Sequence, residues 1–130
     1  MAVKTLISTT DLQQLQQSEQ VAIIDCRFSL MDAEIGEQQY AAGHIPGARY
    51  AHLNRDLSGP IQPGKTGRHP LPDRDTFTNT VRQLGIEKDQ TVVAYDADTG
   101  AYAARLWWLL RWLGHANVMV LDGGMNAWQA

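Results

Sequence analysis

Cysteine is nearly absent from this sequence of 130 residues, since Cys26 is the only one. A single cysteine cannot form a disulfide within the chain, and it cannot supply a cysteine-rich zinc site. The histidines do not show the spacing of metal ligands either; they are His44, His52, His69 and His115. We therefore expect neither a metal ion nor another cofactor.

Long apolar runs are also missing. The sequence contains no stretch of about 18 apolar residues, the length that spans a bilayer. Its first residues, MAVKTLISTT, lack the extended apolar segment of a secretory signal. These absences predict a cytoplasmic protein that does not interact with a membrane.

Positive charge is in slight deficit, because 11 Lys and Arg residues are set against 14 Asp and Glu residues, for a net charge of -3. Acids and bases are intermixed along the chain, so no basic stripe is available to neutralise a phosphate backbone. We therefore expect no nucleic-acid partner. The 44% hydrophobic and 19% charged residues are typical of a folded globular protein, and the length suits one domain over residues 1–130.

The sequence does contain a regular alternation of helical and extended patterns. Helical patterns cover residues 7–20, 35–43, 72–85 and 101–114, and another begins within 123–130. Apolar runs typical of buried strands cover 21–25, 91–95 and 117–121, and 48–53 is a short extended segment. Such alternation predicts an α/β fold, with a parallel sheet and helices on both faces.

Three acids follow the predicted strands, at Asp25, Asp96 and Asp122. In open α/β sheets, ligands bind outside the carboxyl ends of the strands, so these acids mark the candidate site. The segment 54–72 is dense in Gly and Pro and is predicted to be a loop. It is longer than a simple connection needs, which indicates a role at the surface.

Three segments resemble the rhodanese (sulfurtransferase) family: DCR at 25–27 with GHIPGA at 43–48, YDADTGAYAARLWWLLRWLG at 95–114, and LDGGMNAW at 121–128. Together they span nearly the whole chain in the expected order. Two further segments, TGRHPLP at 66–72 and AARLWWLLRWLGH at 103–115, resemble the amino-terminal half of two-domain thiosulfate and 3-mercaptopyruvate sulfurtransferases.

This resemblance implies a rhodanese-like fold and a division of labour between two domains. The parent enzyme would move sulfane sulfur from thiosulfate or 3-mercaptopyruvate to cyanide or a thiol, through a cysteine persulfide in a second domain. The present chain would be the supporting first domain, and the second domain would be its partner. A non-enzymatic rhodanese-like binding or regulatory module is the alternative.

The resemblance places the nucleophile position of the family at Asp96. The loop continues with Ala97, Asp98, Thr99, Gly100 and Ala101. A carboxylate cannot hold sulfane sulfur, so the loop is degenerate and the chain alone is expected to be inactive. Asp96 either accepts N–H bonds from the loop and the helix start, or acts as a base or anion site. Asp98 and Thr99 are N-cap candidates, and we expect weak anion binding at this loop.

Cys26 is the one alternative nucleophile. It follows a buried strand and has no adjacent histidine in the sequence, which favours an inert thiol that packs in the core. On either side of it, Asp25 and Arg27 are expected to form a structural ion pair that anchors a loop, with a substrate contact as the other possibility. Asp122, at the third strand end, is assigned a structural role.

His44 is predicted to bond the backbone and to fix the turn of the GHIPGA segment. The resemblance implies an alternative role, in which His44, with Asp32 or Asp25 as its partner, reaches the active site of the second domain. Arg68 and His69 lie in the long loop, where they could face an anionic substrate or the acids of a partner, or could simply be solvated.

The helical segment around Trp107, Trp108 and Trp112 is apolar nearly all round and is interrupted only by Arg105 and Arg111. A helix that lies on one sheet needs an apolar stripe on one side alone. Its outer face is therefore either packed against neighbouring helices or covered by the second domain.

Overall fold

The computed structural model describes residues 5–18, 20–97 and 99–130. Within these residues the strands are β1 (Leu6–Ile7), β2 (Val21–Asp25), β3 (Arg49–Tyr50), β4 (Thr91–Tyr95) and β5 (Val118–Leu121). The helices are α1 (Thr9–Gln17), α2 (Ile35–Ala42), α3 (Arg74–Gln83), α4 (Ala101–Leu113) and α5 (Gly124–Gln129). None of the described helices is both long enough and apolar enough to cross a membrane.

All strand pairs are parallel, and the strands follow the order β1-β5-β4-β2-β3. The α/β prediction is therefore confirmed. The sequence patterns did not reveal β1, because its two residues are too few for a recognisable periodicity. The extended segment predicted at 48–53 was too long, since only Arg49 and Tyr50 pair with β2.

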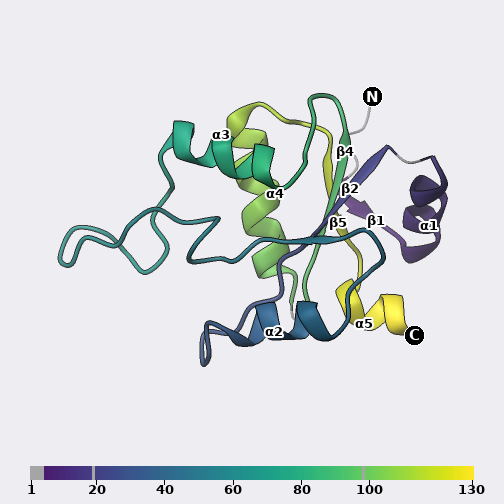
Figure 1. Cartoon of the computed structure of the whole chain (residues 1–130), viewed down its shortest axis with the longest axis horizontal. Coiled ribbons are helices and arrows are strands. Elements are labelled where there is room, and N and C mark those ends of the chain that lie inside the picture. Colours follow the sequence, from purple (N-terminus) through teal and green to yellow (C-terminus); the bar gives the residue numbers. More distant parts are fainter. Residues whose placement is uncertain (1–4, 19, 98) are drawn as a thin grey trace.

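Alternate residues of β4 point to opposite faces of the sheet, as strand geometry requires. Val92 and Ala94 belong to one buried cluster, which also contains residues of α3 and α4. Val93 and Tyr95 belong to the other, with residues of α1 and α5. The predicted arrangement, with helices on both faces, is confirmed, and Figure 1 shows α3 and α4 on the side of the sheet away from α1 and α5.

The ends of the helices follow local rules. Ser8 caps α1 by accepting the N–H of Asp11, and Asp73 caps α3 by accepting the N–H groups of Asp75 and Thr76. The helix α4 ends at Gly114, which adopts the left-handed conformation with φ of 107°. The sequence alone therefore located these helices closely.

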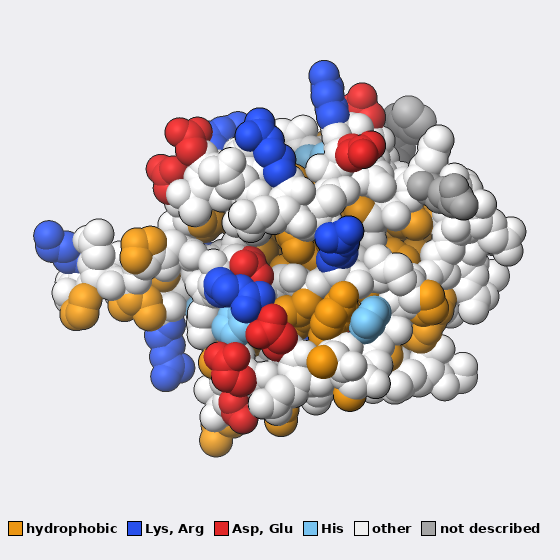
Figure 2. All heavy atoms as spheres, in the orientation of Figure 1, with side chains coloured by type: hydrophobic (Ala, Val, Ile, Leu, Met, Phe, Trp, Pro, Cys, Tyr) orange, Lys and Arg blue, Asp and Glu red, His pale blue; other side chains and the backbone are white. Residues whose placement is uncertain are grey.

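The long loop between β3 and α3 projects from the body of the molecule (Figure 1). Four of the five prolines lie in it, and Ile61 is 59% exposed. Figure 2 shows hydrophobic and basic side chains on this projection. Its two stems are held together by a hydrogen bond from the Gly59 N–H to the Pro70 carbonyl, 2.9 Å long.

Candidate functional site

Asp96 follows β4 directly and is 2% exposed. Its Oδ1 accepts the N–H of Gly100 at 3.2 Å, and its Oδ2 accepts those of Tyr102 at 3.1 Å and Ala103 at 2.9 Å. These donors lie at the start of α4, where N–H groups have no partner within the helix and the helix dipole favours a negative charge. The prediction that Asp96 accepts N–H bonds from the helix start is confirmed.

The described residues after Asp96 lead into α4. Thr99 is exposed, and the helix is capped by Gly100 with φ of 94° and without a side-chain cap bond. The expectation of a cap at Thr99 is therefore wrong, because the carboxylate of Asp96 already occupies the N–H groups of the first turn. Asp98, the other expected cap, lies outside the described residues. Ala97 lies at the surface, and Ala101 is the first residue of α4.

The start of α5 packs tightly on the same loop. The N–H of Met125 donates to the carbonyl oxygen of Asp96 at 2.9 Å, and a Cβ at Gly124 would overlap with that oxygen. Gly124 therefore allows the close approach of two backbones. Asp122 is exposed, and its N–H donates to the carbonyl of Ile7 at 2.8 Å.

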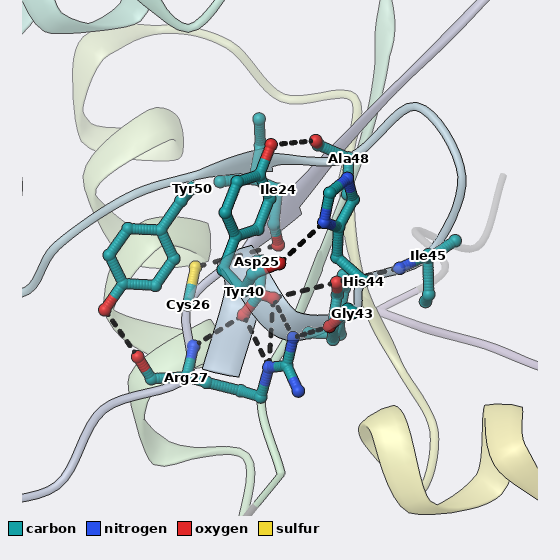
Figure 3. Close-up of polar contacts among 11 residues, drawn as sticks. Ile24, Asp25, Cys26, Arg27, Tyr40, Gly43, His44, Ile45, Ala48 and Tyr50 are labelled. Atoms are coloured by element: carbon teal, nitrogen blue, oxygen red, sulfur yellow. Dashed lines mark hydrogen bonds and ion pairs between the residues drawn. The ribbon is translucent and has the colours of Figure 1, made fainter. Parts of the chain in front are cut away.

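Asp25 and Arg27 form a buried ion pair at the end of β2 (Figure 3). Arg27 Nη2 lies 2.7 Å from Asp25 Oδ2, and Nε lies within 3.1 Å of both carboxylate oxygens. Nη2 also donates to the Gly43 carbonyl at 2.6 Å, which ties the pair to the end of α2. The predicted structural ion pair that anchors a loop is confirmed.

Two tyrosines that no sequence motif indicated complete this network. The Tyr95 hydroxyl donates to Asp25 Oδ2 at 2.9 Å, and the Tyr50 hydroxyl donates to the Arg27 carbonyl at 2.7 Å. Burial, and then the negative charge of Asp25, raises the pKa of both hydroxyls. A tyrosine at the very end of an apolar strand run was the available signal for Tyr95.

Cys26 is 1% exposed and belongs to the core cluster that includes residues of α4. Burial first, and then the charges of Asp25, Asp96 and Asp56, raise the pKa of its thiol well above the ordinary value. A thiol that stays protonated and has no access to solvent is not a nucleophile. The interpretation of Cys26 as a core residue is confirmed.

His44 is exposed, and its Nδ1 lies 2.7 Å from the Tyr40 carbonyl. Its ring stacks on that of Tyr40 with centroids 4.0 Å apart, and the Tyr40 hydroxyl donates to Ala48 at 2.6 Å. The predicted backbone bond of His44 is confirmed. Among the described residues, neither Asp25 nor Asp32 forms a hydrogen bond or ion pair with His44.

Arg105 holds the long loop against α4, a role that the sequence pattern did not indicate. Its guanidinium donates to the carbonyls of Leu57, His69 and Pro70, at distances from 3.0 to 3.1 Å. His69 therefore sits close to a fixed cation, and burial, followed by the charges of Arg105 and Arg68, lowers the pKa of its ring. Arg68 and His69 both line a hollow of about 300 Å³ beside Phe28.

The tryptophans of α4 are only partly available to a partner. Trp107 and Trp112 pack against the core cluster, whereas Trp108 is 46% exposed. Trp108 and Trp112 stack with centroids 6.1 Å apart, and the Arg74 guanidinium of α3 lies 5.5 Å from the Trp112 ring. Packing within the domain therefore accounts for most of this face.

The described residues include no group of three or more His, Cys, Asp or Glu side chains arranged to hold a metal ion. Polar chemistry at the carboxyl end of the sheet rests instead on the two buried carboxylates and on Arg27. Arg27 also lines a hollow together with Gln39 and Ala97.

The model of the rhodanese-like domain family matches residues 8–130. A relative in Pseudomonas aeruginosa, "Probable 3-mercaptopyruvate sulfurtransferase", is 44% identical over 131 residues, which cover 100% of this chain and 46% of the relative. The "Putative thiosulfate sulfurtransferase SseB" of Mycobacterium tuberculosis is 41% identical over 128 residues, which cover 98% of this chain and 44% of that relative. The chain thus spans less than half the length of these relatives.

Two solved structures are similar over nearly the whole chain. The 3-mercaptopyruvate sulfurtransferase of Leishmania major matches with a TM-score of 0.88 and 32% identity, covering 99% of this chain and 35% of that one. The 3-mercaptopyruvate sulfurtransferase SseA of Escherichia coli matches with a TM-score of 0.84 and 31% identity, and the match covers 97% of this chain and 47% of that one. Both are longer than the present chain.

Proposed function

This chain belongs to the rhodanese-like domain family, and on that premise we propose that it is the supporting, non-catalytic domain of a two-domain sulfurtransferase. Its relatives are named sulfurtransferases, and the chain aligns with less than half of each. The parent enzyme takes sulfane sulfur from thiosulfate or 3-mercaptopyruvate. A cysteine in the second domain carries that sulfur to cyanide or a thiol.

The observation that carries this proposal is the environment of Asp96. Converging N–H groups at a helix start would stabilise a thiolate or persulfide, but here they are bound to a carboxylate that is part of the chain. Cys26, the only thiol, is buried and has a raised pKa. The chain therefore has a loop of suitable form and no sulfur carrier within it.

The parent reaction follows from thiolate chemistry. The cysteine thiolate of the second domain attacks the outer sulfur of thiosulfate or the thiol sulfur of 3-mercaptopyruvate. A new S–S bond forms on the cysteine, and the S–S bond of thiosulfate or the C–S bond of 3-mercaptopyruvate breaks. Thiosulfate thereby releases sulfite. 3-Mercaptopyruvate releases pyruvate, once the carbon that carried the sulfur takes up a proton. Attack by cyanide on the outer sulfur then releases thiocyanate and restores the thiolate.

In this proposal the second domain covers exposed apolar and basic groups of the present chain. Trp108, stacked on Trp112, offers a preformed aromatic surface of the kind that is enriched at interfaces. His44 and Arg68 are exposed and could contribute polar contacts at the edge of the second domain's site. Replacing Trp108 with Ala should weaken the docking of the separately expressed second domain, measured by calorimetry.

Transfer of sulfur from thiosulfate to cyanide tests the proposal. We expect no transfer with the purified 130-residue chain and transfer with the natural protein of which it is a part. Activity of the chain alone that disappears in Cys26→Ala would contradict the proposal. A natural reading frame without a second, cysteine-bearing rhodanese domain would instead favour the alternative, a non-enzymatic binding module.

A further inference from the structure

A hollow lies beside the loop that Asp96 fills, at the carboxyl end of the sheet. It consists of two adjoining pockets of about 430 Å³ and about 400 Å³, which share Arg27, Gln39 and Ala97. Each is within the size range of small-molecule sites, roughly 300–1,000 Å³. Phe28 and Tyr102 line the first pocket, so this side offers aromatic surface.

The second pocket has a polar wall. Three residues with side-chain amides, Gln39, Asn126 and Gln129, line it together with Gly43. Each amide has two N–H donors and one acceptor oxygen. Aromatic surface on one side and a few polar side chains on the other are typical of sites that bind small molecules.

Arg27 forms the border between the two pockets and has donors to spare. The guanidinium carries five N–H groups. Nε and Nη2 bond to Asp25 and Gly43, and none of the described residues accepts a hydrogen bond from Nη1. The side chain is only 9% exposed. In Figure 3 the guanidinium nitrogen of Arg27 that has no dashed line points away from Asp25.

The charges around the hollow decide which acceptor Nη1 can take. Asp25 already neutralises the Arg27 guanidinium, and Asp96 adds a second buried negative charge nearby. The negative charges of both acids also act on the Cys26 thiol, where they add to burial in raising its pKa. An anion would therefore meet no excess of positive charge, whereas an uncharged oxygen can accept from Nη1 without electrostatic repulsion.

We propose that this hollow binds a small, uncharged carbonyl compound. The Nη1 group of Arg27 donates to the carbonyl oxygen, the amides of Gln39 and Asn126 supply further hydrogen bonds, and the apolar body lies against Phe28 and Tyr102. The site does not depend on the proposed sulfur transfer, since its ligand class differs from the anionic sulfur donors.

Benzamide and benzoate form a matched pair of probes, because they share size and shape and differ in charge. We expect titration of the ¹⁵N-labelled chain with benzamide to shift the NMR signals of the Gln39 and Asn126 side-chain amides and of the Ala97 N–H. Benzoate should bind at least about threefold more weakly, as repulsion from the net negative charge of Asp25, Arg27 and Asp96 predicts. Equal or tighter binding of benzoate, or benzamide shifts confined to another face, would overturn the proposal.

Substitutions locate the site. Gln39→Ala and Asn126→Ala should each weaken benzamide binding about fivefold, the effect of one lost hydrogen bond. Gln38→Ala is the control, because Gln38 is exposed on the same helix and does not line the hollow. Unchanged affinity in both test variants, or an equal loss in the control, would refute the site. Arg27→Lys removes Nη1 and should weaken binding further, provided that its spectrum shows a folded chain.

Discussion

Asp25 and Asp96 are buried carboxylates at the ends of neighbouring parallel strands, and the fold neutralises them in different ways. Asp25 faces the guanidinium of Arg27, a side chain of opposite charge. Asp96 faces three backbone N–H groups at the start of α4. Removing Asp25 leaves a buried cation without its partner, whereas removing Asp96 leaves neutral donors that any small anion or water can satisfy.

This difference explains why only the end of β4 can accommodate different anionic groups. The donors around Asp96 belong to the backbone, so they remain in place whatever the side chain is. The partner of Asp25 is itself held by Asp25 and by the Gly43 carbonyl. The end of β4 can therefore serve as an anion cradle in a relative that carries cysteine there, while the end of β2 is fixed as structure.

The largest effect is expected from Asp25→Ala. It should lower the free energy of unfolding by about 4 kcal/mol, because the buried charge of Arg27 loses its partner. Urea denaturation measures the loss. The control is Asp32→Ala, since Asp32 is exposed and its side chain accepts one hydrogen bond, from the Glu34 N–H. The double variant Asp25→Leu/Arg27→Met should recover most of the stability. A double variant as unstable as the single one would show that the pair is not the cause.

Asp96→Ala should lower the free energy of unfolding by less, about 2 kcal/mol. The helix start loses its side-chain acceptor, but no buried charge is left without a partner. The same urea measurement applies. Added sulfate should restore part of the loss in this variant and not in Asp25→Ala, since only the open helix start offers free N–H donors. A sulfate effect of equal size in both variants would remove the distinction between the two carboxylates.

Asp96→Cys should be the mildest change at the end of β4, about 1 kcal/mol, because a thiolate accepts the same N–H bonds. The helix start should lower the pKa of this thiol. Position 96 lines a pocket with Thr99 and Gly100, so we expect iodoacetamide to label this thiol at neutral pH faster than it labels Cys26 in the unmodified chain. Mass spectrometry after thiosulfate treatment then shows whether a persulfide forms. If none forms although the thiol is reactive, the shape of the loop, not only the missing nucleophile, prevents sulfur loading.

Tyr95→Phe should have the smallest effect at neutral pH, about 0.5 kcal/mol, since it removes one neutral donor to Asp25. Its signature is the pH dependence. The folded pKa of Tyr95 is raised, so its contribution to stability is complete below the unfolded value of about 10 and is lost as the pH rises above it. Stability should therefore fall less steeply above that pH in the variant, measured by urea titrations. An identical pH profile in the variant would contradict the raised pKa.

Much of the fold was predictable because its signals are local. The caps Ser8 and Asp73 act on N–H groups two or three residues away, and the strand runs at β2 and β4 are apolar on both faces. The role of Asp96 was also predictable, since the N–H groups that donate to its carboxylate follow within seven residues. Thr99 was assigned wrongly because the pattern could not show that Asp96 already occupied the first turn.

The sequence by itself determined the alternation of strands and helices, the acids at the strand ends and the lack of an accessible sulfur carrier in the loop. Only the tertiary structure decided that Tyr95 bonds Asp25 across 70 positions, that Arg105 holds a loop 35 or more positions away, and that Arg27 faces a hollow. Caps and periodicity depend on neighbours along the chain. Buried polar groups instead take whichever partners the packed elements bring to them.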